Sequence, residues 1–150
     1  MIKTKNRITL CVALLMVNLA FIWGNSLLPG ELSGAFSRWV KELIAFLLGQ
    51  PQGGEGGHGM LRKLAHFTEF CTLGMCLRWL FGMLLQKKWT KFALPLTAGF
   101  LAACIDETIQ MFVPGRGPGI KDVGIDTAGV LAGIVFIILI HKKYLEDNKP

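Results

Sequence analysis

Four long apolar runs constrain the fold of this chain more than any other feature of its sequence. They cover residues 8–28, 64–86, 92–113 and 122–140, the last beginning between Ile120 and Gly124. A helix of roughly 20 residues crosses the hydrocarbon core of a bilayer, and 52% of the 150 residues are hydrophobic. The sequence therefore predicts one all-α membrane domain, a four-helix transmembrane bundle, with the lipid bilayer as its first partner.

The basic residues lie in short clusters between the apolar runs. Despite the net charge of +6, this pattern is typical of topology signals and gives no reason to expect a nucleic-acid partner. With a cytoplasmic N-terminus, that side holds nine Lys and Arg residues: Lys3, Lys5, Arg7, Lys87, Lys88, Lys91, Lys142, Lys143 and Lys149. The opposite side holds six: Arg38, Lys41, Arg62, Lys63, Arg116 and Lys121. We therefore expect a multi-pass protein of the cytoplasmic membrane with both termini in the cytoplasm.

The first run also has the basic start of a secretory signal peptide. No small-x-small cleavage motif follows it, so we expect it to be retained as a span. The four cysteines all fall within predicted spans without a Cys-x-x-Cys pair, which indicates small buried side chains.

The long outer connection between the first two runs divides into two parts. Residues 32–48 repeat Leu, Phe, Trp and Val at helical spacing, with charged residues on the other side. This pattern predicts an extracytoplasmic amphipathic helix lying on the membrane surface or re-entering it. Residues 49–60 are rich in glycine and predict a flexible link.

Polar residues interrupt the third run near its outer end, at Asp106, Glu107 and Gln110. An Asp at the centre of a spanning helix costs about 2.5 to 3.5 kcal/mol, so these groups require partners. The neighbouring helices offer such partners at the same depth, because the second and fourth runs both begin there. The candidate residues are Lys63, His66, Glu69, Asp106, Glu107, Gln110, Arg116, Asp122 and Asp126. Together they predict a mixed-charge pocket in the outer half of the membrane.

Two further features bear on this pocket. Gly129 and Gly133 form a Gly-x-x-x-Gly step on nearly the same helix face as Asp122 and Asp126, which predicts a tight helix contact below the charged cluster. The cluster could serve only to lock three helices together. However, its five carboxylates exceed the charge of two cations and one histidine, so some acid is protonated, hydrated or bound to a cation. The sequence contains no specific metal-binding motif, so we expect no cofactor; a bound divalent cation is the alternative.

Four motifs, in order, resemble the VanZ-like family of bacterial membrane proteins. They are "FIWGNSLLP" ending the first run, "KLAHFTEF" opening the second, "ETIQMFVPGR" closing the third and "DVGIDTAGVLAG" opening the fourth. The resemblance covers most of the chain. The family's marked positions fall on Lys63, His66, Glu69, Glu107, Gln110, Arg116, Asp122, Asp126 and Gly129.

This sequence departs from the family pattern at one residue. It also differs from the family's founding member in one motif. Asp126 stands where the pattern commonly has Asn, which adds a negative charge. The founding member lacks the Lys-x-x-His-x-x-Glu portion in this form. That member is associated with low-level resistance to the glycopeptide antibiotic teicoplanin, and the resemblance implies a similar role in the cell envelope.

Two main functions follow from the residues. In the first, the pocket binds an amphiphile, either a lipid-linked cell-wall precursor or a lipoglycopeptide, with Lys63 and Arg116 meeting phosphate or carboxylate. In the second, which we favour less, a membrane enzyme acts on a lipid-linked phosphate or ester through His66, Glu69 and Glu107. Transport is disfavoured because only Arg78 continues the polar path toward the cytoplasm.

Overall fold

Most of the described residues lie in helices, and none of them forms a strand. The computed structural model describes residues 2–47, 58–117 and 119–147. Its helices are α1 (Ile2–Ser26), α2 (Gly30–Leu47), α3 (His58–Leu84), α4 (Thr90–Met111) and α5 (Ile120–Asp147). The expectation of an all-α protein is therefore confirmed.

Three of these helices are long and apolar enough to cross a membrane. The qualifying segments are Lys5–Ser26 in α1, Thr90–Met111 in α4 and Ile120–Asp147 in α5. Helix α3 is also long, but Glu69 and Arg78 lie inside its apolar stretch and lower its hydropathy. Length and composition thus support a multi-pass membrane protein with three spans where the sequence predicted four.

The helix boundaries differ from the expected runs mainly at the ends. Helix α3 begins at His58, so the last three residues of the expected 49–60 link form its first turn, and most of that link lies outside the described residues. Helix α5 continues to Asp147, beyond the expected end at residue 140. Helix ends of this kind extend past the apolar run because backbone hydrogen bonding does not require apolar side chains.

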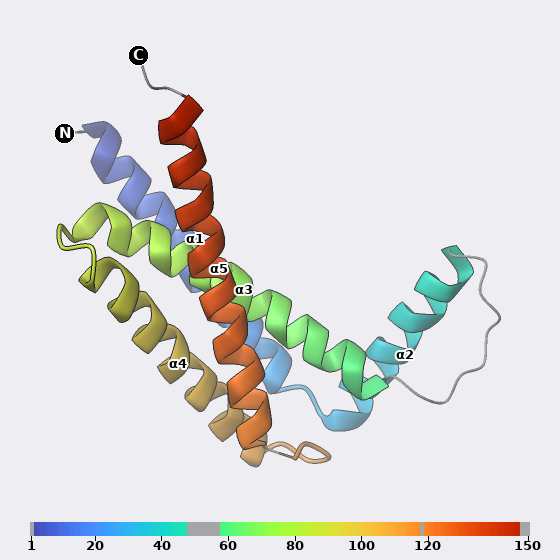
Figure 1. Ribbon diagram of the computed structural model, residues 1–150. Helices are drawn as coiled ribbons and strands as arrows, with labels where there is room; N and C mark the ends of the chain where they lie inside the picture. The colour runs from blue at the N-terminus through green and yellow to red at the C-terminus, as the bar shows by residue number, and fades with distance from the viewer. Residues whose placement is uncertain (1, 48–57, 118, 148–150) are drawn as a thin grey trace.

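The helices pass back and forth between two ends of the molecule. In Figure 1, α1 leaves the end that holds both chain termini, α3 returns toward it, α4 leads away and α5 comes back. Helix α2 projects to one side, and its main packing partner is α3. The most extensive helix contact joins α3 and α5.

Side chains from α1, α3, α4 and α5 form one buried core. Its fully or largely buried members are Ile22, Phe70, Leu73, Leu77, Ala102, Ala103, Val130 and Ile134. Many large apolar side chains remain exposed on the outer faces of the same helices, among them Val17, Phe21, Leu101 and Leu139. An apolar exterior around an apolar core is expected when the surroundings are lipid.

Glycines allow α3 and α5 to approach closely. A Cβ at Gly74 would overlap the backbone of Val130, and one at Gly133 would overlap the carbonyl of Cys71. A Cβ at Gly129 would collide with the backbone of Phe67. The tight contact predicted from the Gly129 and Gly133 step is therefore confirmed, and it lies directly below the polar residues of α5.

A second close approach fixes the turn between α4 and α5 against the start of α2. Gly30 N donates a hydrogen bond to the carbonyl of Pro114 at 3.0 Å, and a Cβ at Gly30 would overlap the carbonyl of Gly115. Gly115 itself has a φ of 74°, a conformation that glycine adopts without strain. This contact positions the next residue, Arg116, over the end of α1.

We expect Gly133→Ala to destabilise the protein by about 1–3 kcal/mol, because the added methyl group overpacks the contact between α3 and α5. The matched control is Gly124→Ala in the same helix, where an added Cβ meets nothing within 4 Å. The control should be neutral or slightly stabilising. Unfolding in mixed micelles, followed by circular dichroism, measures both; equal stability of the two variants would contradict the tight contact.

Candidate functional site

Asp106 is the centre of a polar cluster at the end of the bundle opposite the chain termini. Its side chain is completely buried. Ser26 at the end of α1 donates a hydrogen bond to Oδ1 at 2.7 Å, and Gln110, one turn along α4, donates one to Oδ2 at 2.8 Å. The bond from Ser26 thereby joins α1 to α4, and the bond from Gln110 holds the same carboxylate against its own helix.

Glu107, the next residue of α4, faces the start of α5. Its Oε2 accepts a hydrogen bond from the backbone N–H of Gly119 at 2.9 Å, and its Oε1 lies 3.4 Å from Nε2 of Gln110. Gln110 is thus shared between the two carboxylates. Adjacent acids on α4 consequently contact different elements, Asp106 toward α1 and Glu107 toward α5.

His66 brings α3 into the same cluster. Its Nδ1 lies 3.7 Å from Oδ2 of Asp106 and 3.7 Å from Oδ1 of Asp126 on α5. Neither Nδ1 nor either oxygen of Asp126 has a hydrogen-bond partner among the described residues, and Asp126 is completely buried. Buried polar groups without partners are uncommon, so this corner of the cluster has unused binding capacity.

Arg116 closes the cluster from the turn before α5. Its Nε and Nη2 donate hydrogen bonds to the carbonyls of Leu28 and Asn25, at 3.1 and 2.8 Å. The Asn25 carbonyl lies in the last turn of α1, where it also accepts a hydrogen bond from the N–H of Leu28 at 3.2 Å, and Leu28 follows the end of the helix. Burial, together with the nearby guanidinium of Arg62, lowers the pKa of Arg116, which nevertheless stays charged. Its third nitrogen, Nη1, has no partner among the described residues.

Glu69 lies one turn below His66 on α3 and contacts α1. Its Oε1 accepts a hydrogen bond from Nδ2 of Asn25 at 2.9 Å, whereas its Oε2 is buried without a partner in the described structure. Asn25 therefore links Glu69 and Arg116, using its side chain for one and its backbone for the other.

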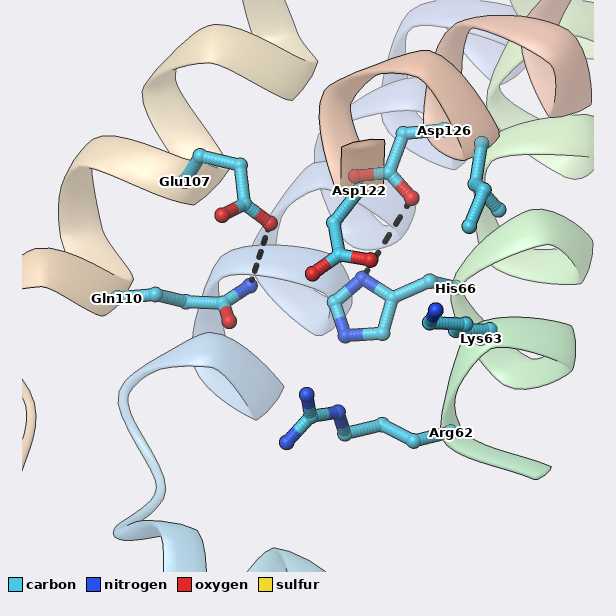
Figure 2. Close-up of a pocket in the computed structure, with 8 residues that line it drawn as sticks. Arg62, Lys63, His66, Glu107, Gln110, Asp122 and Asp126 are labelled. Carbon is cyan, nitrogen blue, oxygen red and sulfur yellow. Dashed lines mark hydrogen bonds and ion pairs between the residues drawn. The ribbon is translucent and has the colours of Figure 1, made fainter. Parts of the chain in front are cut away.

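A small cavity opens between α3, α4 and α5. Its volume is about 10 Å³, which is room for one water molecule or ion. Figure 2 shows Arg62, Lys63 and His66 reaching it from α3, Glu107 and Gln110 from α4, and Asp122 and Asp126 from α5. Lys63 is exposed and Asp122 is half-buried, so both lie toward its mouth.

Two larger cavities lie on the other side of His66. One, of about 280 Å³, has a polar wall that contains Asn25, Arg62, His66, Glu69 and Arg116. The other, of about 360 Å³, lies between α2 and α3 and is lined mainly by apolar groups such as Val40, Leu61 and Leu64. Both cavities are lined by Ser37, Ala65 and Glu69, so they adjoin each other. Together they form a groove that is apolar over most of its lining and carries polar side chains on one wall at one end, which we call its polar end; we call the whole the α2–α3 groove.

The structure places the predicted site residues at one end of the molecule, where most of them line different cavities. Six of them line the small cavity: Lys63, His66, Glu107, Gln110, Asp122 and Asp126. Glu69 and Arg116 line the polar end of the α2–α3 groove, and His66 lines both spaces. The imidazole of His66 faces Asp106 and Asp126, while Glu69 is bonded to Asn25.

Three residues of the cluster were absent from the sequence-based candidates. Asn25 and Ser26 end α1, and Arg62 lines both the small cavity and the groove. The polar pair at the end of the apolar run, in "GNSLLP", is the signal that could have identified the first two. The sequence predicts Arg62 only as one of the basic residues that indicate topology, because periodicity alone does not show on which side of α3 it lies.

Comparison with known proteins gives one match. The family model described as VanZ/LLP1 matches residues 8–141, which is most of the chain. No curated protein and no solved structure matches.

We expect Ser26→Ala to cost about 1–3 kcal/mol, because it removes a hydrogen bond from a buried carboxylate. Thr108→Ala on α4 is the control, since this exposed hydroxyl bonds only the carbonyl of Cys104 in its own helix. Free energies of unfolding in mixed micelles measure both. A Ser26→Ala variant as stable as the control would contradict the role of this bond.

Proposed function

Because the chain belongs to the VanZ/LLP1 family, we propose that it is an accessory protein of the bacterial cell envelope. In this proposal it is embedded in the cytoplasmic membrane and binds the head group of an amphiphile at the outer leaflet. The ligand is a lipid-linked cell-wall precursor or a lipoglycopeptide such as teicoplanin, and its binding confers tolerance to the antibiotic. The continuity of the polar and apolar ends of the α2–α3 groove carries the proposal.

The proposed topology has four crossings, with α3 as the additional one. The path of the chain supports it, since α1 leads away from the end that holds the termini and α3 returns toward it before α4 begins. The polar residues of α3 face the cluster: Glu69 bonds Asn25, and His66 lies beside Asp106 and Asp126. A span can carry such residues when they face the bundle interior.

Helix α2 suits a position at the membrane surface. Leu32 and Leu43 are more than 40% exposed, so this apolar side of α2 is largely uncovered in the part of the chain that the structure describes. Ser33, Ser37 and Val40 face the cavities between α2 and α3. An amphipathic helix with an apolar outer side lies in the headgroup region, where it would form one wall of the groove.

The polar end of the groove has the chemistry of an anion site. Arg62 and Arg116 both line it, and the positive charge of Arg62 disfavours the charged form of Arg116. Nη1 of Arg116 has a donor to spare. A phosphate or carboxylate between the two guanidiniums would relieve their repulsion and accept charge-assisted hydrogen bonds. The apolar end of about 360 Å³ would hold the first part of an acyl or prenyl chain.

A second candidate function is an enzyme that acts on the same lipid-linked phosphate or ester. The observation that favours it is the position of His66, which lines the groove while its Nδ1 faces two carboxylates. A carboxylate beside an imidazole can orient it for proton transfer. Incubation of the protein with undecaprenyl phosphate and undecaprenyl diphosphate distinguishes the two, because only an enzyme converts either lipid to a product.

We expect Arg62→Gln to weaken binding of undecaprenyl phosphate by about tenfold to a hundredfold, as the loss of a charge-assisted hydrogen bond predicts. Native mass spectrometry of the protein in nanodiscs measures the affinity. The same substitution should abolish any teicoplanin tolerance that the wild-type protein confers on a susceptible host.

Arg78→Gln is the control for that experiment. Arg78 is on the same helix but lines a separate cavity with Arg7 and His141 at the end that holds the termini. Undecaprenol, which lacks the phosphate, is the control ligand. Equal binding of phosphate and alcohol, or equal effects of the two substitutions, would contradict a head-group site at Arg62.

The proposed orientation is tested by cysteine accessibility. We expect Gly117→Cys, in the turn between α4 and α5, to react with a membrane-impermeant maleimide in intact cells. Lys88→Cys, in the turn between α3 and α4, should react only after the membrane is permeabilised. Both positions are exposed, so solvent access does not distinguish them. The reverse result would place the polar cluster at the cytoplasmic face.

A further inference from the structure

We propose that His66, Asp106 and Asp126 bind one divalent metal ion, which joins α3, α4 and α5 inside the polar cluster. This site shares His66 with the wall of the α2–α3 groove, but the inference does not depend on which amphiphile the groove binds. Its evidence is the geometry of three side chains and the absence of other partners for two of them.

The three side chains present ligand atoms at suitable separations. Nδ1 of His66 lies 3.7 Å from an oxygen of Asp106 and 3.7 Å from an oxygen of Asp126, and all three atoms lie within 4.8 Å of one another. Metal–ligand bonds of about 2.0–2.2 Å place neighbouring ligand atoms roughly 3 to 4 Å apart. An ion can therefore sit among these atoms with only small movements of the side chains.

Asp126 is the ligand whose surroundings most favour a bound ion. It is completely buried, and neither of its oxygens has a hydrogen-bond partner in the described residues. Nδ1 of His66, whose side chain is only 13% exposed, is also without a partner there. Figure 2 shows the carboxylate of Asp126 directed at the imidazole. When Nδ1 of the neutral imidazole carries no proton, it and the carboxylate are two acceptors 3.7 Å apart, an arrangement that a cation satisfies.

The surrounding groups complete the site. Ser26 and Gln110 bond Asp106 and hold its carboxylate in place, as outer-shell partners of metal ligands do. The cavity of about 10 Å³ beside His66 and Asp126 gives room for a water molecule as a further ligand. Two carboxylates and a neutral imidazole carry two negative charges, which a divalent ion neutralises.

The donor set selects the class of metal. Imidazole favours zinc and other transition metals, whereas carboxylates also suit manganese and magnesium. One nitrogen with two carboxylate oxygens fits Zn²⁺ or Mn²⁺ better than Ca²⁺, which takes six to eight oxygen ligands. These two ions are therefore the probes for the test.

The test is calorimetric titration of Zn²⁺ and of Mn²⁺ into full-length protein that has been stripped with a chelator and placed in nanodiscs. We expect about one equivalent of one of these ions to bind per chain and to raise the unfolding temperature. Asp126→Asn, which nearly preserves the side-chain shape, and His66→Gln should each weaken binding by about a hundredfold or more. Ser26→Ala should weaken it about tenfold through Asp106.

Glu146→Gln is the matched control, because Glu146 is another carboxyl on α5 but is exposed, pairs with Lys142 and lies outside the three ligands. It should bind metal as the wild-type protein does. Circular dichroism confirms that each variant is folded, and His66→Gln carries the test if Asp126→Asn does not fold. Absence of Zn²⁺ and Mn²⁺ binding by the wild-type protein, or unchanged binding by folded Asp126→Asn or His66→Gln, would overturn the proposal.

Discussion

The buried carboxylate of Asp106 is the interaction on which the rest of the structure depends. A charged group inside a membrane protein is tolerated only when other protein groups solvate it. Here the solvating groups come from different parts of the chain, with Ser26 from α1, Gln110 from α4 and His66 from α3 nearby. Side chains from three helices are thereby held at one level, beside the small cavity and the polar end of the α2–α3 groove.

The glycine contacts and the polar cluster lie at two different levels of the bundle. Below the cluster, Gly74 and Gly133 let α3 and α5 pack backbone to backbone. At the level of the cluster the same helices carry His66 and Asp126, whose polar atoms lie 3.7 Å apart. The close contact below sets the spacing of the two helices, so the polar groups above it are positioned before a ligand arrives, which favours binding.

Much of this arrangement could be predicted from the sequence. Apolar length predicted four spans, of which those in α1, α4 and α5 are long and apolar enough in the structure, and helical spacing placed His66, Glu107, Gln110 and Asp126 at one depth. The rest depended on information that periodicity lacks. The spacing did not indicate that Asn25 would take Glu69 as its partner, because partner choice depends on helix rotation. The spacing could not reveal the α2–α3 groove either, because the groove depends on the angle at which α2, beginning at Gly30, packs against α3.

The central claim is that a buried carboxylate positions helix ends to form a site for an amphiphile. A structure of the protein in lipid nanodiscs containing undecaprenyl phosphate tests it most directly. The claim predicts head-group density between Arg62 and Arg116, chain density between α2 and α3, and Asp106 still bonded to Ser26 and Gln110. Density for water alone at the guanidiniums, with lipid chains only on the outer faces of α1, α4 and α5, would contradict it.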